Sequence, residues 1–288
     1  MRSAFSYIVT VGLSGMLLAP AFGSVIYNNL TPSNAMGVAT RPTGTEIESA
    51  DDFFLGSQTL INGASFTGIL VPGTGGTPSI AEVVVEIYRV FPLDSNTVRT
   101  PNVPTRANSP SDVAFSSRDS GAGALLFSST QVATNFTVLN TVQPGGIHPS
   151  PNQTTNGNGP LTGTEVQIDV TFPAPFNLPA DHYFFVPQVL LTNGGQFYWL
   201  SAQRPITGAG GTTPFPVGVT DLQAWTRDDI LDPDWLRVGT DIVGGATPPT
   251  FNLAFSLAGT ALPEPGTPFV VLAGLLLIGI GRRYAAKA

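Results

Sequence analysis

The sequence predicts an all-β protein, an antiparallel β-sandwich of the jelly-roll-like kind, and two observations carry that prediction. Gly and Pro are frequent, with 32 and 26 residues among 288, and they interrupt the chain every few positions. The short runs between them are rich in Val, Ile, Thr and Phe, which favour strands. Such runs separated by turn residues are typical of sandwiches and barrels. Only the two ends differ, and there an N-terminal signal helix and a short C-terminal hydrophobic helix are expected.

In the first half of the chain, the clearest strand is expected at residues 81–90. Val83, Val85 and Ile87 alternate with polar neighbours, which predicts one buried face. Residues 92–118 contain many Pro, Ser and Thr residues and are expected to form a long excursion. The other strands expected in this half are 25–27, 49–54, and 58–66 with its continuation 67–70.

In the second half, residues 182–191 are apolar almost throughout, which predicts a central strand covered on both faces. The run 164–172 alternates well and is expected to be half-buried. Asn193-Gly194-Gly195 predicts a hairpin turn into a strand at 196–202. A second excursion is expected at 144–161. The last expected strands are 223–225, 235–238 and 251–259.

The N-terminus has the composition of a secretory signal peptide. Arg2 is the only charged residue before an apolar stretch at 7–18, and small residues follow at 19–23. Three segments are therefore expected, which are a signal peptide at 1–23, a β-sandwich domain at 24–260 and a sorting segment at 261–288. One domain is preferred for the middle segment, and a two-lobed sandwich divided near 144–160 is the alternative.

The C-terminus combines three features in a fixed order. Pro263-Glu264-Pro265 comes first, an apolar run from Phe269 to Gly281 follows, and Arg282-Arg283 comes directly after it. A helix of that run would be roughly 20 Å long, against about 30 Å for the hydrocarbon core. The arginines predict a cytoplasmic C-terminus, with the rest of the chain outside. An ordinary weak single-span anchor is the alternative.

This order and spacing resemble the PEP-CTERM sorting signal. The resemblance covers under a tenth of the chain, at Pro263, Glu264, Pro265, Arg282 and Arg283. It implies a Gram-negative-type bacterium and processing by an exosortase-type membrane protease near the Pro-Glu-Pro motif. It also implies transient residence in the inner membrane, followed by the cell surface or the extracellular polysaccharide matrix. The basic cluster is shorter than usual, with two arginines and then Tyr284-Ala285-Ala286-Lys287.

The composition of the middle segment excludes several partners. Four basic residues and one acidic residue lie in the two end segments, so its net charge is −10, against −7 for the whole chain. Such a surface attracts neither nucleic acid nor anionic lipid. The chain has no Cys, which excludes a disulfide framework and a thiolate metal site.

Four carboxylates close together suggest a calcium site. Asp228, Asp229, Asp232 and Asp234 fall within seven residues, and carboxylate oxygens are ligands for Ca²⁺. Their spacing does not match an EF-hand loop. The alternative is that Asp229 or Asp232 caps a turn. No other cofactor is expected.

Catalytic residues are scarce, and no enzyme is expected. The chain has two histidines, His148 in an excursion and His182 at a strand entrance. A triad of His182 with Ser201 is conceivable, but the middle segment lacks a Gly-x-Ser-x-Gly motif. Asp51-Asp52 is an adjacent carboxylate pair whose members should point to opposite faces of a strand and be solvated.

All three tryptophans lie in the last third of the chain, at Trp199, Trp225 and Trp235. Flat aromatic faces suit sugar rings, so these residues are candidates for contact with a glycan. Trp235, next to the acidic residues, is the one expected to be exposed. The alternative is that the three rings fill the core.

These observations predict an exported, non-catalytic protein of the cell surface or the extracellular polysaccharide, anchored and sorted through its Pro-Glu-Pro motif. One alternative is a purely structural or adhesive sandwich. The other is a secreted glycan-active hydrolase, which two carboxylates converging in a cleft would favour.

Overall fold

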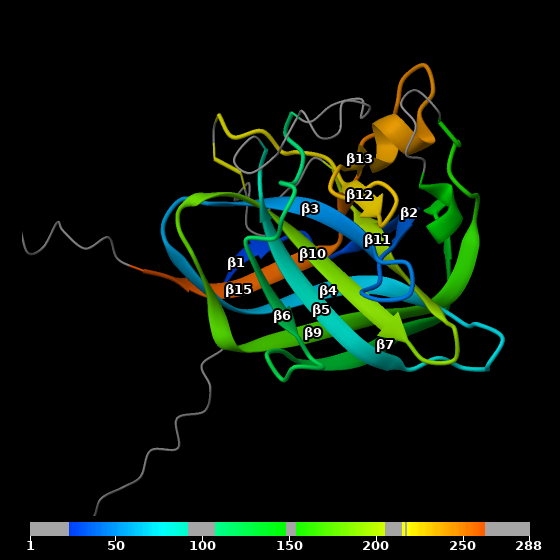
Figure 1. The fold of residues 1–288 in the computed structure, drawn as a ribbon, viewed down its shortest axis with the longest axis horizontal. Coiled ribbons are helices and arrows are strands. Elements are labelled where there is room, and N and C mark those ends of the chain that lie inside the picture. The colour runs from blue at the N-terminus through cyan, green and yellow to red at the C-terminus, as the bar shows by residue number, and fades with distance from the viewer. Residues whose placement is uncertain (1–22, 92–106, 148–153, 205–214, 217, 263–288) are drawn as a thin grey trace, which may run out of the picture.

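The computed structural model describes residues 23–91, 107–147, 154–204, 215–216 and 218–262 (Figure 1). The described chain forms two β-sheets and almost no helix, so the predicted all-β class is confirmed. The elements are β1 (Ser24–Asn28), β2 (Pro32–Ala39), β3 (Ile47–Leu55), β4 (Thr59–Val71), β5 (Ile80–Arg89), β6 (Ser116–Asp119), β7 (Leu126–Val138), β8 (Thr141–Val142), the 3₁₀ turn η1 (Pro144–Gly146), β9 (Leu161–Leu178), β10 (Asp181–Leu191), β11 (Gln196–Ala202), β12 (Trp225–Asp228), β13 (Leu236–Arg237), the π-helical turn η2 (Val238–Val243), β14 (Asn252–Leu253) and β15 (Phe255–Ala261).

The larger sheet has nine strands and is organised around β4. Its main path runs β1-β15-β4-β11-β2-β8, and β14 pairs with β11. The long strand β9 pairs with β4 as well, and β7 pairs with β9 (Figure 1). The pairing of β2 with β8 is parallel, whereas the other pairs are antiparallel.

The smaller sheet has six strands in the order β13-β12-β3-β10-β5-β6. Strand β10 lies between β3 and β5 and is buried along most of its length, as its apolar sequence predicted. Its side chains alternate between two clusters. Tyr183 and Phe185 enter the main core, while Phe184 and Val186 enter a second one.

The main core contains side chains from both sheets, so it joins them. Phe185 of the smaller sheet stacks on Phe255 of the larger one, with ring centroids 5.0 Å apart and planes inclined by 9°. The second core, here called the outer core, lies on the opposite face of the smaller sheet. It consists of Ala50, Tyr88, Phe184, Val186, Leu222, Trp225 and Trp235. Leu222 and Trp235 come from the segments before and after β12, so these segments, residues 220–224 and 229–235, pack on this sheet face and are here called the cover.

The prediction that β10 and the next strand, β11, form a hairpin is wrong, because the two strands do not pair with each other. The turn itself exists, with positive φ angles of 58° at Asn193 and 66° at Gly194. However, β10 belongs to the smaller sheet and β11 to the larger one. The turn therefore carries the chain from one sheet to the other, because β11 finds its partners in β2 and β4.

Other departures concern polar strands. Strand β9 continues to Leu178, beyond the expected end at residue 172, and β2, β6 and β7 were not predicted. Most side chains of β7 are exposed, so its sequence shows no alternation of apolar and polar residues.

The predicted signal helix and C-terminal helix lie outside the described residues. Within the described part of the chain, none of the helices has the length and apolar character needed to cross a membrane.

Candidate functional site

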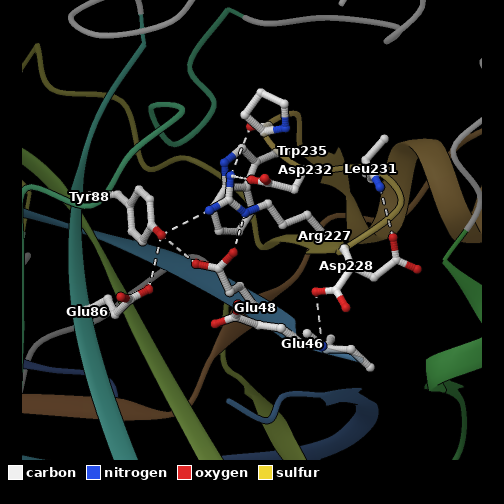
Figure 2. A network of polar contacts seen from close by, with 12 residues as sticks. Glu46, Glu48, Glu86, Tyr88, Arg227, Asp228, Leu231, Asp232 and Trp235 are labelled. Atoms are coloured by element: carbon white, nitrogen blue, oxygen red, sulfur yellow. Dashed lines mark hydrogen bonds and ion pairs between the residues drawn. The ribbon is translucent and has the colours of Figure 1, made fainter. Parts of the chain in front are cut away.

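A polar cluster occupies the cover side of the smaller sheet, next to the outer core (Figure 2). Glu48 comes from β3, Glu86 and Tyr88 come from β5, and Arg227 comes from β12. These residues alternate with the apolar residues of the main core, so the pleat of the strands turns them toward the cover. We call Glu48, Glu86, Tyr88, Arg227 and Asp232 the Arg227 cluster.

Arg227 is the centre of this cluster. Its side chain forms an ion pair with Glu48 and another with Asp232, whose Oδ1 lies 2.8 Å from Nη1. Nη1 also donates to the Asp112 and Pro233 carbonyls, at 3.1 and 3.0 Å. The guanidinium carbon lies 4.4 Å from the centre of the Trp235 ring, a cation–π distance. Burial is the largest single effect and acts to lower the pKa of Arg227. Glu48, Tyr88 and Asp232 together outweigh it, so this pKa is raised.

Tyr88 contacts both glutamates with one hydroxyl group. Its oxygen lies 2.5 Å from Glu48 Oε1 and 3.0 Å from Glu86 Oε2, and it accepts a hydrogen bond from Arg227 Nη2 at 3.0 Å. The hydroxyl has a single proton, which it donates over the shorter distance to Glu48. A full hydrogen bond to Glu86 therefore requires a proton on the Glu86 carboxyl group.

The electrostatic environment agrees with a protonated Glu86. Burial, and after it the neighbouring Glu48 carboxylate, raises the pKa of Glu86 from its ordinary value of 4.5 to about 8. Burial also raises the pKa of Glu46, which lies at the edge of the same region. The cluster thus holds one neutral carboxylic acid near an ion-paired carboxylate at neutral pH.

The Arg227 cluster forms part of the wall of an open cavity of about 490 Å³. Glu46, Asp112, Asp228 and Asp229 also line this cavity. Glu48 is only 5 % exposed and Arg227 also 5 %, so both act mainly within the protein. Chemically, the site combines a carboxyl group that can donate a proton with an acidic rim that would repel anions.

The predicted calcium site is not assembled. Two backbone N–H groups, those of Ile230 and Leu231, donate to Asp228 Oδ1 at 3.1 and 3.0 Å. Asp229 accepts from the N–H of Glu46, and Asp232 pairs with Arg227. Asp234 is buried. Among the described residues, no group of three or more His, Cys, Asp or Glu side chains is arranged to hold a metal ion. The turn capping that was considered for Asp229 or Asp232 is performed by Asp228.

The three tryptophans are buried, and the expected exposure of Trp235 is wrong. Trp199 is 0 % exposed, and Trp225 and Trp235 are each 2 % exposed. The indole N–H groups of Trp199 and Trp235 donate to the carbonyls of Ala254 and Ser111, at 2.9 and 3.2 Å. Trp235 is covered because its ring packs between Arg227 and the edge of Tyr88. None of the three rings offers a face to solvent for stacking.

The structure does not assemble the triad that was considered for His182. His182 Nε2 lies 2.6 Å from Asp52 Oδ2, but Ser201 bonds to Ser33 Oγ and to the N–H of Met36 in the other sheet. Within the described residues, no hydrogen bond joins His182 to Ser201. His148 lies outside the described residues.

The expectation that Asp51 and Asp52 are solvated is wrong, since they are 0 % and 1 % exposed. Their opposite orientation is as expected, because Asp51 accepts from the N–H of Leu253 and Asp52 from that of Leu222. Burial, and after it the Asp52 charge, raises the pKa of Asp51 well above its ordinary value.

The sorting residues Pro263, Glu264, Pro265, Arg282 and Arg283 also lie outside the described residues. Apart from Asp232, which was considered as a calcium ligand or a turn cap, the members of the Arg227 cluster were not identified from the sequence. The available signal was weak: Glu86 and Tyr88 alternate with Val85 and Ile87, which placed them on the face opposite the core. Nothing in the sequence indicated that a cover would bury that face.

The comparisons with known proteins do not assign this chain to a family. No family model, curated protein or solved structure matches it. The fold and the site therefore define only a class, an all-β protein of two sheets with a cover over the smaller one and an arginine-centred acidic cluster beneath that cover.

Proposed function

We propose that this chain is an exported bacterial protein that is sorted through its C-terminal segment and then associates, without catalysis, with the cell surface or the extracellular polysaccharide. The observation that carries the proposal is the order Pro263-Glu264-Pro265, apolar run, Arg282-Arg283. Its partners would be an exosortase-type membrane protease, the inner membrane before processing, and the polysaccharide afterwards. The predicted signal peptide at 1–23 supports export independently.

The position of the terminal strands supports processing at both ends. Strand β1 pairs with β15, and Ser24 lies opposite Gly259. Both predicted end segments would therefore leave the body from the same pair of strands, and their removal would break none of the β1–β15 pairs. The jelly-roll-like sandwich is part of this proposal, and its support is that the two sheets share one core.

A secreted glycan-active hydrolase is the second candidate function. Glu48 and Glu86 converge on Tyr88 beside a cavity, and a protonated carboxyl near an ionised one is the pairing that glycosidases use. Against it, Glu48 is buried and already paired with Arg227. A carboxylate held in this way is poorly placed to attack a substrate or to activate water, so the non-catalytic function is favoured.

The sorting proposal is tested by replacing Pro263-Glu264-Pro265 with three alanines in the source organism. We expect the variant to remain unprocessed in the inner membrane, while the natural chain appears outside as a shorter species. Cell fractionation and intact mass measure both properties, and Thr267→Ala in the spacer is the matched control. If the alanine variant had the mass and location of the natural chain, the sorting proposal would be wrong.

The two candidate functions are separated by incubating the purified full-length protein with polysaccharide from the same organism. The non-catalytic function predicts co-sedimentation without new reducing ends. New reducing ends that disappear in Glu86→Gln would establish the hydrolase instead, because that variant keeps the shape of a neutral carboxyl but cannot give up a proton.

A further inference from the structure

The long strand β7 forms an edge of the larger sheet (Figure 1). It pairs with β9 along one side, and among the described residues no strand pairs with its other side. The backbone N–H and C=O groups along such a side can bond to another chain. Natural proteins therefore blunt a long edge strand with charged residues, Pro or a bulge.

Part of β7 lacks this protection. Residues 126–131 run in unbroken register with β9, and the first irregularity follows Gln131. Irregularities of this kind protect the rest of the strand. The regular part contains neither Pro nor a charged residue, and no Asp, Glu, Lys or Arg occurs anywhere in residues 120–164. An unprotected edge therefore extends from residue 126 to the start of the irregular part.

Large apolar side chains are exposed on the same strand. Leu126 is 60 % exposed and Val132 is 58 % exposed. Of the seven large apolar side chains that are exposed in the described chain, these two and Leu139 lie within β7 or directly after it. Single exposed apolar residues are normally scattered over a surface, so this concentration on one strand indicates a contact surface.

The chemistry of the edge is self-complementary. Its polar side chains can each donate and accept a hydrogen bond, and they are Ser128, Ser129, Thr130 and Gln131. Strand β7 already uses such a pair within the protein, because Thr137 Oγ1 lies 2.6 Å from Thr162 Oγ1 of β9. An identical strand in antiparallel orientation would offer matching groups along the whole edge.

The charge distribution favours contact between two copies at this edge. The middle segment of the chain carries a net charge of −10, so two copies repel each other. This repulsion is reduced where uncharged strands meet. On β9, Asp169 lies opposite Ser128, but it is one strand away from the edge and accepts from Ser65 and Gln167, at 2.5 and 2.8 Å.

We propose that two copies of this chain associate by antiparallel pairing of their β7 edges, about a two-fold axis at Ser129. An axis perpendicular to the sheet places residues of the same sheet face opposite each other. In the register centred on Ser129, Ser128 lies opposite Thr130 of the second copy. Leu126 lies opposite Val132, so the two exposed apolar side chains cover one another at both ends of the ladder. This pairing closes after two copies, because it uses the unpaired side of both strands.

The interface is small, so the dimer is expected to be weak. A ladder over residues 126–132 is about 24 Å long, and a single strand pair buries less than the roughly 1,200 Å² of a stable complex. We expect a dissociation constant between about 10 μM and 1 mM. The inference concerns assembly and does not rest on the proposed sorting or on association with polysaccharide.

The first test measures self-association of the purified full-length chain in detergent by analytical ultracentrifugation, from about 10 to 500 μM. Ser129→Lys places two cations opposite each other on the axis, and we expect it to weaken association about fivefold or more. Asn135→Lys is the matched control, because it adds the same charge at an exposed position of β7 outside the ladder. We expect the control to associate like the natural chain.

Two results would overturn the inference. A natural chain that stays monomeric up to about 500 μM would mean that the edge of β7 has a different occupant or none. Equal association of Ser129→Lys and Asn135→Lys would mean that the copies meet elsewhere. Both measurements use purified protein, so neither depends on processing in the cell.

The second test examines the register and uses the absence of Cys from the chain. Opposite residues of an antiparallel pair have Cα atoms about 4.5 or 5.5 Å apart, which a disulfide can span. Ser129→Cys should therefore form a disulfide-linked dimer under mild oxidation. We expect it to do so about tenfold faster than Asn135→Cys or more, because the paired strands hold the two thiols at a high effective concentration. Equal rates for the two variants would overturn the pairing about Ser129.

Discussion

At the scale of single residues, the hydroxyl group of Tyr88 bridges the two glutamates of the Arg227 cluster. Its one hydroxyl proton is placed between two carboxyl groups while Arg227 donates to the same oxygen. Burial, and after it the neighbouring Glu48 carboxylate, keeps on Glu86 a proton that it would lose in water. The cost of releasing that proton appears as a dependence of stability on pH.

The first prediction concerns Glu86→Gln. The folded state raises the pKa of Glu86 from 4.5 to about 8, so it binds more protons than the unfolded state between these values. The contribution of Glu86 to the free energy of unfolding should accordingly be largest below about pH 4.5. It should fall as the pH rises through about 8. Chemical denaturation between pH 5 and 9, a range chosen around these values, should show a flatter pH dependence for Glu86→Gln. Glu82→Gln, on the same strand but outside the cluster, should keep most of the slope, and identical slopes for all three proteins would contradict the assignment.

The second prediction concerns Arg227→Met. The change leaves Glu48 buried without its cation, and we expect a loss of about 3–5 kcal/mol in the free energy of unfolding. Adding Glu48→Gln should restore part of the loss, because the uncompensated charge is then removed. Arg41→Met, at a half-exposed side chain, is the control and should cost about 0.5 kcal/mol. A loss in Arg227→Met as small as that of the control would mean that the cluster does not stabilise the fold.

At the scale of elements, β4 connects most of the larger sheet. It pairs with β9 along one edge and with β15 and β11 along the other. At Gly68 it comes so close to β11 that an added Cβ would lie 2.2 Å from the Phe197 ring and 2.6 Å from the Tyr198 carbonyl oxygen. The absence of a side chain at Gly68 is therefore a condition for this pairing.

The third prediction is that Gly68→Ala destabilises the protein by about 1–3 kcal/mol, the usual cost of overpacking, or by more, since one of the close atoms belongs to the backbone. Thermal unfolding followed by circular dichroism measures the effect. Gly145→Ala is the matched control, because no atom lies within 4 Å of its added Cβ. Equal unfolding temperatures for the two variants would refute the importance of this close approach.

Whether a strand could be predicted from the sequence depended on how its side chains are buried. Strands with clear patterns, such as β5 and β10, were predicted within a few residues, because burial of one or both faces leaves a local pattern of apolar residues. Strand β7 was missed because its side chains are mostly exposed and uncharged polar residues. The hairpin after β10 was mispredicted because a turn sequence specifies local geometry and does not select the partner strand.

At the scale of the whole molecule, the two ends of the described body meet. Tyr27 of β1 stacks on Phe255 of β15, with ring centroids 4.4 Å apart, and the ladder between the two strands closes one edge of the larger sheet. The predicted signal and sorting segments lie beyond this pair of strands, so the body contains every strand pair of the two sheets without them.

The fourth prediction follows from that arrangement. A chain of residues 24–262 should unfold at the temperature of the full-length protein, because it contains every described strand of the two sheets. A chain of residues 29–262 lacks β1 and the Tyr27 ring and should lose at least about 3 kcal/mol, as for removal of a large buried aromatic side chain. Calorimetry of the two chains tests this, and a lower stability already in the 24–262 chain would show that an end segment supports the fold.

The sequence by itself determined the all-β class, the buried face of β5 and the central position of β10, because these depend on patterns within a few neighbouring residues. Only the tertiary structure decided which sheet each strand joins, that all three tryptophans are buried, and that Asp228, Asp229 and Asp232 have separate partners rather than forming one group. The same holds for the Arg227 cluster, since Arg227 and Glu48 are 179 positions apart. Contacts of that separation depend on how the cover packs on the smaller sheet, and no local pattern encodes the partner of a buried charge.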